Sequence, residues 1–419
     1  MTINTKPQNI EKSETELILI RIAGIDRPGL TANLTDILAE YDVSILDIGQ
    51  ADIHNTLSLG ILFKTESSKS GHIMKDLLFK AADLNISIRF YPITNEEYSK
   101  WVGMQGKHRY ILTILGRKLT ARQIAHTTKI IADQGMNIDS IRRLTGRIPL
   151  DEKKARTRAC IEFSVRGTPR DSKEMNYNLM RMGKELSIDY SLQVDNMYRR
   201  IRRLICFDMD STLIQTEVID ELAIRAGVGD QVKAITASAM RGEIDFKESF
   251  TKRVALLKGL DASILKEIAK NLPITEGVDR LMFALKKYGY KIAILSGGFN
   301  FFGNYLKRKY QLDYVYANEL EIEDGKLTGK YIGDIVDGKR KSELLQLIAQ
   351  VENIDLNQTI AVGDGANDLP MLGISGLGIA FHAKPKVAAN AEQSINTIGL
   401  DGVLYFLGFK DSYLDEDKI

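Results

Sequence analysis

The sequence predicts an α/β domain built on a parallel sheet, preceded by two small α+β domains of the same plan. Two observations carry this prediction. An order of strand, helix and strand occurs twice in the first half of the chain, and short apolar strands alternate with helices from residue 204 onward. At 419 residues the chain is also too long for one compact core, which favours two or three domains.

The first repeat follows a polar segment at residues 1–15, which we expect to be a loose tail. An apolar run at residues 16–24 is typical of a strand and leads into the turn Ile25-Asp26-Arg27-Pro28-Gly29. Residues 30–41 place apolar side chains at helical spacing, and residues 43–48 are typical of another strand.

The second repeat shows the same order, with a strand at 110–116, a helix at 120–134 and a strand at 135–141. Gly24 corresponds to Gly116, an offset of 92 residues. A repeat of this length indicates a duplicated small domain, because a solenoid needs three or more shorter units. Each copy is predicted to follow the order β-α-β-β-α-β.

The α/β domain is expected at residues 203–410. Its predicted strands are short apolar runs at 204–207, 291–295, 314–317, 359–362 and 378–380. The first two strands are too far apart for one crossover helix, so we expect a helical cap at about 216–285 over the strand ends. Residues 319–330 predict a β-hairpin on an Asp324-Gly325 turn.

Composition excludes several classes of protein. The net charge of +2 gives no reason to expect a nucleic-acid or membrane partner. The basic cluster at residues 198–203 has no recognition motif beside it, and we interpret it as a solvated linker. Two distant cysteines, Cys160 and Cys206, exclude a disulfide framework and fit a reducing compartment. With no apolar signal segment and no membrane span, we expect a cytoplasmic protein.

Polar and glycine residues follow three of the predicted strands. Asp208 and Asp210 follow the first, Ser296-Gly297-Gly298 follow the second, and the run from Gly363 to Asp368 follows the fourth. Lys341 lies just ahead of another predicted helix, at 343–351. Because ligands bind beyond the carboxyl ends of parallel strands, we expect these groups to converge at one edge of the sheet.

This set of groups suits phosphoryl transfer. Asp208 and Asp364 offer the oxygen ligands that Mg²⁺ prefers, and a hydroxyl, turn N–H groups and a lysine can hold phosphate oxygens. One carboxylate can attack phosphorus while a second acid moves the proton. Each segment alone has a simpler interpretation, such as a helix cap, a turn or a surface lysine. Four of them in this order predict a catalytic site.

The first repeat also resembles a known module. The stretch G-I-D-R-P-G at residues 24–29 is similar to the start of an ACT domain, which often binds amino acids as effectors. The resemblance covers residues 16–96 and 107–196, although Arg117-Lys118-Leu119-Thr120 replaces the turn in the second copy. It implies an amino-acid effector near the glycine turn at Asp26 and Gly29, or copies that only mediate contacts, and a homodimer.

The second half resembles the haloacid dehalogenase-like hydrolases through the order D-x-D-S-T, S-G-G, K and G-D-G-x-N-D. Within them, four stretches over residues 203–408 are similar to the phosphoserine phosphatase family: DMDSTLIQTEVIDELA, MRGEIDFKESFTKRVALLKGL, ILSGGF and AVGDGANDLPML. The resemblance implies a haloacid dehalogenase-like Rossmannoid parallel sheet with an inserted helical cap, preceded by two α+β ferredoxin-like ACT domains.

The resemblance also implies a role for each motif residue. The catalytic group comprises the nucleophile Asp208, the general acid and base Asp210, and Lys341, which binds phosphate and balances charge. The Mg²⁺ ligands are Asp208, Asp364 and the backbone carbonyl of Asp210. The phosphate site comprises Ser296, Gly297 and Asn367, supported by Asp368. Glu217 is expected to bind the substrate ammonium, and Arg253 is expected to bind the substrate carboxylate. Met240 and Phe246 are expected to form an apolar lid.

The implied activity is Mg²⁺-dependent hydrolysis of O-phospho-L-serine to L-serine and phosphate through an aspartyl-phosphate. This is the last step of serine biosynthesis, with serine as the expected regulator. Two alternatives remain open from the residues. The same chemistry could act on another phosphorylated amino acid or transfer the phosphoryl group to another alcohol. The chain could also be an amino-acid sensor with a vestigial phosphatase half.

Overall fold

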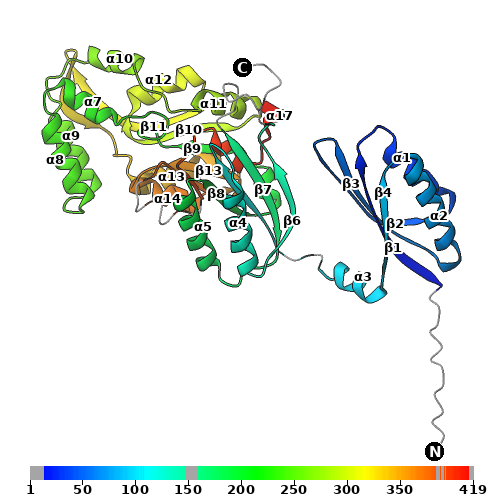
Figure 1. Cartoon of the computed structure of the whole chain (residues 1–419). Helices are drawn as coiled ribbons and strands as arrows, with labels where there is room; N and C mark the ends of the chain where they lie inside the picture. Colours follow the sequence, from blue (N-terminus) through cyan, green and yellow to red (C-terminus); the bar gives the residue numbers. More distant parts are fainter. Residues whose placement is uncertain are drawn as a thin grey trace, which may run out of the picture. The chain divides into compact units, whose positions relative to one another are not determined.

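The computed structural model describes residues 14–104, 106, 108–147, 158–383, 387, 391 and 393–414 (Figure 1). Most of the polar tail expected at residues 1–15 lies outside the described residues. The chain divides into two compact units, Met1–Gly106 and Lys107–Ile419. Among the described residues, no helix has the length and apolar character needed to cross a membrane.

The first unit contains the first repeat. Its elements are β1 (Thr15–Ile25), α1 (Leu30–Glu40), β2 (Ser44–Ile53), β3 (Thr56–Glu66), α2 (Ser67–Asp83), β4 (Ser87–Ile93) and α3 (Asn95–Val102). The strands pair antiparallel in the order β2-β3-β1-β4. Ile18, Ile20 and Ile22 alternate inward along β1 and pack with the apolar face of α1. The predicted β-α-β-β-α-β plan is confirmed, with β2 longer than the strand expected at 43–48.

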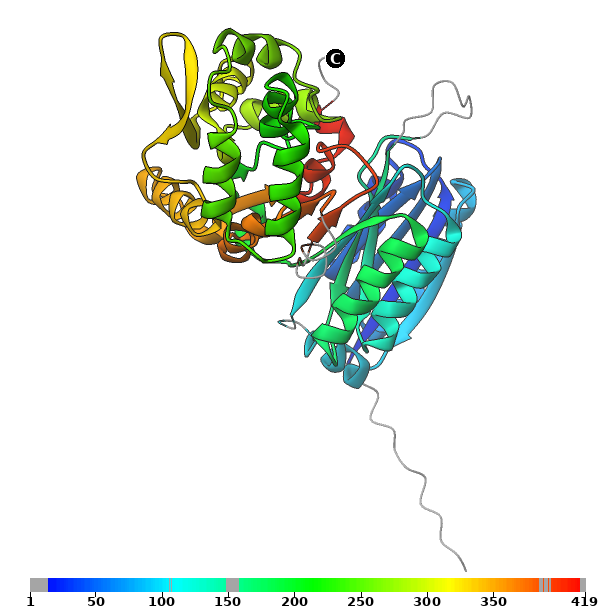
Figure 2. The ribbon, with the colours of Figure 1, turned by 90° about the vertical axis from the view of Figure 1, so that its left-hand side faces the viewer.

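The second repeat opens the second unit. Its elements are β5 (Arg109–Gly116), α4 (Ala121–Asp133), β6 (Asn137–Arg143), β7 (Ala159–Arg166), α5 (Ser172–Leu186), β8 (Asp189–Val194) and the short helix α6 (Met197–Arg200). The strand order β6-β7-β5-β8 corresponds to β2-β3-β1-β4 of the first unit. Helices α4 and α5 lie side by side on one face of these strands (Figure 2). The duplication predicted from the sequence is therefore confirmed.

The α/β domain is built around a central strand that carries the Asp208–Asp210 segment at its end. The strands are β9 (Leu204–Phe207), β10 (Lys291–Phe299), β11 (Tyr314–Glu323), β12 (Lys326–Ile332), β13 (Thr359–Gly363), β14 (Leu377–Phe381) and β15 (Gln393–Ile395). The order β11-β10-β9-β13-β14-β15 is parallel throughout, so the carboxyl ends of β9, β10 and β13 are neighbours. The fold class predicted from the sequence is confirmed.

The predicted hairpin is present between β11 and β12. Asp324 and Gly325 connect the two strands with φ angles of 48° and 75°, the left-handed conformation that a tight hairpin turn requires. The strand predicted at 314–317 does not end before the hairpin, however. It continues as one strand, whose first part pairs with β10 and whose second part pairs with β12.

The helices of the α/β domain form two groups. The first group is inserted after β9 and precedes α11 (Val278–Lys287), the helix that leads into β10. It comprises α7 (Val218–Arg225), α8 (Gly229–Met240), α9 (Phe246–Ala255) and α10 (Ser263–Lys270). The others are α11, α12 (Asn300–Tyr310), α13 (Gly338–Val351), α14 (Leu369–Ile374), α16 (Gly402–Phe406) and α17 (Asp411–Leu414), with 3-10 turns η2 (Leu356–Gln358) and η3 (Ala366–Asp368). Helices α8 and α9 contact one another and form the cap over the strand ends.

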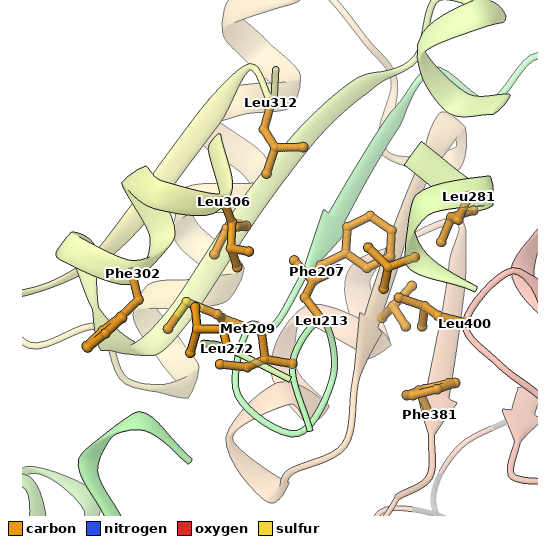
Figure 3. Close-up of a cluster of buried hydrophobic side chains, with 14 of the residues drawn as sticks. Phe207, Met209, Leu213, Leu272, Leu281, Phe302, Leu306, Leu312, Phe381 and Leu400 are labelled. Atoms are coloured by element: carbon orange, nitrogen blue, oxygen red, sulfur yellow. The ribbon is translucent and has the colours of Figure 1, made fainter. Parts of the chain in front are cut away.

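The core of this domain anchors the segment that follows β9. Phe207, Met209 and Leu213 lie in the middle of a cluster of buried apolar side chains (Figure 3). Leu281 of α11 and Phe302 of α12 belong to the same cluster, from opposite sides of β9. Apolar side chains alternate with the two aspartates in this segment. Burial of the apolar side chains therefore holds Asp208 and Asp210 at the edge of the sheet.

The second repeat and the α/β domain share one sheet of eleven strands, a continuity that the sequence did not predict. Strand β15 pairs antiparallel with β8, and Gln393 adds two hydrogen bonds to the backbone of Leu192, at 2.9 and 3.0 Å. Asp189 accepts hydrogen bonds from the backbone N–H groups of Asn396 and Thr397. The two domains are therefore joined by backbone pairing as well as by side chains.

Arg117, which belongs to the segment that replaces the D-R-P-G turn, contributes to the same junction. Its guanidinium forms two hydrogen bonds with Glu276, at 2.7 and 2.6 Å, and donates a third to the carbonyl of Thr397. This bidentate geometry is the one that arginine and carboxylate prefer. The departure from the turn sequence in the second repeat thus contributes a contact between domains.

The basic cluster at residues 198–203 differs from its interpretation as a solvated linker. Arg199 is 8% exposed and pairs with Glu162 at 2.6 Å, and Arg202 is 6% exposed. The interpretation is wrong for these two residues because the second repeat packs against the α/β domain at this point and covers them.

Candidate active site

The polar residues that follow β9, β10 and β13 meet at one cavity of about 890 Å³. Ten of the residues singled out in the sequence line it: Asp208, Asp210, Glu217, Met240, Phe246, Arg253, Ser296, Gly297, Asp364 and Asn367. Helices α8 and α9 contribute the cap side of the wall, and the strand ends contribute the floor. The expected convergence at one sheet edge is therefore present in the structure.

The segment after β9 turns sharply. The backbone N–H of Asp208 donates to the carbonyl of Val362 on the neighbouring strand at 2.9 Å, and its carboxylate accepts from the N–H of Met209 at 2.7 Å. Ser211 has a φ of 57°, the left-handed conformation that allows the turn. The Asp210 carboxylate faces the start of α7, where it accepts from the N–H of Val218 at 3.4 Å. Both acids are thus held in place by backbone groups.

Lys341 lies fully buried beneath these acids. Its ammonium is 2.9 Å from the Asp208 carboxylate and 2.7 Å from that of Asp368. Burial alone would lower the pKa of Lys341, but the two carboxylates overcome this effect and raise it above the ordinary value. The sequence placed Lys341 just ahead of a helix, which is wrong. Helix α13 begins at Gly338 because Asp337 accepts a hydrogen bond from the N–H of Arg340 and caps it.

The glycines of the Ser296-Gly297-Gly298 turn are needed for close approach. A Cβ atom on Gly298 would lie 2.5 Å from the Asp210 carboxylate, and one on Gly297 would lie 2.9 Å from the Phe246 ring. The Ser296 hydroxyl accepts a hydrogen bond from the N–H of Gly298 at 3.0 Å. A side chain at position 298 would fill space beside Asp210, and one at position 297 would collide with Phe246 of the cap.

Three carboxylates are close enough to hold a metal ion. Ligand atoms of Asp208, Asp364 and Asp368 lie within 4.8 Å of one another. Both oxygens of Asp368 already accept hydrogen bonds, one from Lys341 and one from the N–H of Gly365. Asp208 and Asp364 are therefore the better candidates for direct ligands, with Asp368 supporting Lys341.

Asp210 has a different electrostatic environment from an exposed acid. Burial raises the pKa of Asp210 well above its usual range, and the nearby charges of Glu217 and Asp208 raise it further. A carboxyl group in this environment favours the protonated form, which is the form that can donate a proton to a leaving group.

The cavity wall also carries charges of both signs next to the cap. Glu217, at the start of α7, accepts a hydrogen bond from the Ser211 hydroxyl at 3.0 Å. Arg253, half-buried on α9, donates from Nε to the carbonyl of Ser249 at 3.3 Å. Burial lowers the pKa of Arg253, whereas Glu217, Asp220 and Asp210 act to raise it. An acid and a cation in the wall of the same cavity suit a ligand with an ammonium and a carboxylate.

Comparison with known proteins identifies the parts of the chain. Residues 16–91 and 108–193 each match an ACT domain model, and residues 205–373 match the model of a haloacid dehalogenase-like hydrolase. A phosphoserine phosphatase of Streptomyces coelicolor is 38% identical over 95% of this chain and 93% of its own length. One from Mycobacterium tuberculosis is 36% identical over 93% of each chain.

The chain belongs to the phosphoserine phosphatase family. Solved structures agree: a haloacid dehalogenase family hydrolase from Salmonella enterica serovar Typhi aligns with a TM-score of 0.61 at 30% identity, over 74% of this chain and all of its own. A probable phosphoserine phosphatase from Vibrio cholerae aligns with a TM-score of 0.56 at 35% identity, over 71% of this chain and 86% of its own. The chain is therefore a haloacid dehalogenase-like hydrolase with two ACT domains.

Two residues of this phosphatase site were missed in the sequence. Asn318, near the middle of β11, donates to the carbonyl of Gly297 at 2.8 Å and accepts from the N–H of Val336 at 2.8 Å, so it positions the glycine turn. Asp220 lines the cavity beside Arg253. A signal for Asn318 was present, because it directly follows the apolar run 314–317, as the other polar groups follow theirs.

Met240 and Phe246, the expected apolar lid of the phosphatase, differ in their surroundings. Phe246 stacks on Phe250, with ring centroids 6.3 Å apart, and packs over Gly297. Met240 also lines the cavity but is 68% exposed. The role of the pair in excluding water stays a prediction.

The residues expected to bind an effector lie in the first ACT domain. Gly29 has a φ of 85° and directly precedes α1, and its carbonyl accepts from the Asn33 side chain at 2.8 Å. Asp26 is exposed, and its N–H donates to the carbonyl of Asn55 at 2.9 Å. The turn expected at this glycine is therefore present, with the glycine in the left-handed conformation, and the effector site stays a prediction.

Proposed function

We propose that the protein is a Mg²⁺-dependent phosphatase that hydrolyses O-phospho-L-serine to L-serine and phosphate through an aspartyl-phosphate on Asp208. The observation that supports the proposal is the single cavity that is lined by Asp208, Asp210 and Asp364 together with Glu217 and Arg253. The names of the full-length relatives support the same substrate.

The donor set fits Mg²⁺. Carboxylate oxygens of Asp208 and Asp364, with the backbone carbonyl of Asp210, are hard oxygen ligands of the kind this ion prefers. Two carboxylates also lie within the one or two that Mg²⁺ usually takes from a protein. When bound, the ion would neutralise charge between the phosphate and the carboxylates.

Asp208 and Asp210 have different parts in the proposed reaction. An Asp208 oxygen attacks phosphorus, the bond from phosphorus to the serine oxygen breaks, and Asp210 gives that oxygen its proton. Asp210 then accepts a proton from a water molecule, whose oxygen attacks the phosphorus of the aspartyl-phosphate. Phosphate leaves, and Asp208 is restored. The raised pKa of Asp210 supports its role as the proton donor.

The cations and turn groups hold the ligand in this scheme. Lys341 contacts the Asp208 carboxylate directly, so it orients the nucleophile and offers a positive charge to the phosphate. Ser296, Gly297 and Asn367 line the same cavity, and in this scheme they hold the phosphate oxygens. Glu217 takes the serine ammonium, and Arg253 takes the serine carboxylate.

Phosphate release from O-phospho-L-serine, measured with and without Mg²⁺, tests the proposal. We expect removal of the metal by EDTA to lower the rate more than about 100-fold and added Mg²⁺ to restore it, because the ion offsets the repulsion between carboxylate and phosphate. Full activity in EDTA would contradict the metal requirement. Absence of hydrolysis with Mg²⁺ would instead favour another phosphorylated substrate or the amino-acid sensor.

Arg253→Ala tests the carboxylate contact. We expect kcat/KM for O-phospho-L-serine to fall about 10- to 100-fold, since one charged hydrogen-bonded contact is lost. The rate for O-phosphoethanolamine, which has the ammonium but no carboxylate, should change little. Arg225→Ala, an exposed arginine on α7 paired with Glu267, is the matched control. An equal loss for both substrates would argue against the assignment.

We further propose that serine inhibits through the first ACT domain near Asp26 and Gly29. The test uses the full chain, because the second repeat shares its sheet with the phosphatase domain. We expect serine inhibition that persists at saturating O-phospho-L-serine in the unchanged protein and in the exposed control Asp36→Ala, and that is lost in Asp26→Ala. Inhibition that saturating substrate removes equally in all three proteins would assign serine to the active site alone.

The homodimer and the cytoplasmic location expected from the sequence also stay predictions.

A further inference from the structure

A second cavity, of about 470 Å³, lies in the second unit where the second repeat meets the α/β domain. Asn176 of α5 and Gln193 of β8 line it from one domain, and Leu372 of α14 and Gly376 line it from the other. Arg202, in the segment that enters β9, also lines it. The volume is within the range of small-molecule sites, which is roughly 300–1,000 Å³.

Arg202 is the unusual member of this wall. It is 6% exposed, and its guanidinium donates to the side-chain oxygen of Gln193 at 2.8 Å and to the carbonyl of Gly376 at 3.2 Å. Its Nε has no hydrogen-bond partner among the described residues. Both acceptors are neutral, and within the described part of the chain Arg202 forms no ion pair with a carboxylate.

Other buried or half-buried cations of the second unit have acidic partners. Arg199 pairs with Glu162, Arg280 pairs with both Asp401 and Asp411, and Lys341 lies between two aspartates. Burial lowers the pKa of Arg202 to about 10, and the neighbouring charge of Arg199 acts in the same direction. A buried charge without an opposite charge beside it is costly. An anion bound next to this guanidinium would therefore be stabilised.

We propose that this cavity binds a small molecule through a carboxylate or phosphate group that pairs with Arg202. The two neutral acceptors hold the guanidinium in place before the anion arrives, which reduces the entropy lost on binding. Asn176, Asn196 and Gln393 add amide groups to the wall for the rest of the ligand. The cavity is separate from the active site, although Leu369 and Leu372 in its wall belong to the helix that begins directly after Asp368.

Thiol protection in Asn176→Cys tests the proposal without relying on activity. Both native cysteines are fully buried, so the introduced thiol is the accessible one among the described residues. We expect millimolar inorganic phosphate or L-serine to slow its modification by a neutral thiol reagent at least about 5-fold, relative to chloride at equal ionic strength. Protection by phosphate assigns a phosphate ligand, and protection by L-serine assigns an amino-acid carboxylate. Tyr177→Cys, 56% exposed on the same helix and outside the cavity wall, is the control.

Arg202→Gln, combined with Asn176→Cys, should remove the protection. Protection by neither probe, or protection that persists in Arg202→Gln and so comes from the active site, would overturn the proposal. A second measurement needs no change at Arg202. An anionic methanethiosulfonate should react faster than a cationic one at Asn176→Cys, relative to Tyr177→Cys, because of the open positive charge. If the ratio of the anionic to the cationic reaction rate were the same at the two positions, the proposal would also be overturned.

Discussion

Asp208→Asn is expected to lower phosphatase turnover by at least about 10⁴-fold, because the amide cannot attack phosphorus. Labelled phosphate from the substrate should no longer be trapped on the chain after acid quenching. The fold should remain, since Lys341 keeps its 2.7 Å contact with Asp368 and the asparagine can still accept from the N–H of Met209. Phosphate release, acid-quench trapping and thermal unfolding measure the three expectations.

The matched control for this variant is Asp334→Asn, which makes the same change at an exposed position of the α/β domain. We expect its turnover and trapping to equal those of the unchanged protein. Near-normal turnover in Asp208→Asn would refute the covalent mechanism, whereas loss of trapping with retained turnover would point to direct attack by water.

Lys341→Met is expected to lower the free energy of unfolding by about 3–5 kcal/mol and to abolish turnover. The ammonium is fully buried between Asp208 and Asp368, so the change leaves two carboxylates together without their cation. Denaturant unfolding in EDTA measures the stability change. Lys339→Met, an exposed lysine on the same helix, is the control and should change stability by less than about 0.5 kcal/mol.

The loss of folding stability in Lys341→Met should also depend on pH. Burial and then Asp208 raise the pKa of Asp368, and Lys341 is the main group that lowers it. Without Lys341, the folded protein holds a proton that the unfolded chain has released, so the stability of the variant falls as pH rises. We expect a larger loss at about pH 8 than at about pH 5. An equal loss at both values would mean that Lys341 acts through packing alone.

The sequence by itself determined the local elements and the chemistry of the main site. A continuous apolar run predicts β1, helical spacing predicts α1, and Asp324-Gly325 predicts the hairpin, because these features depend on neighbours along the chain. The sequence also predicted that the motif residues after β9, β10 and β13 lie close together, because the carboxyl ends of parallel strands share one edge of the sheet. Their convergence at one cavity follows the same rule.

Only the tertiary structure decided how the second repeat meets the α/β domain. The pairing of β15 with β8 uses backbone groups that every residue carries, so no residue type marks the partner strand in advance. Arg117 meets Glu276 across 159 positions of sequence. Arg202 was expected in solvent and is buried without an acid, because burial is set by segments distant along the chain. Local pattern thus defined the elements and their chemistry, and packing between distant segments defined the junction and the second cavity.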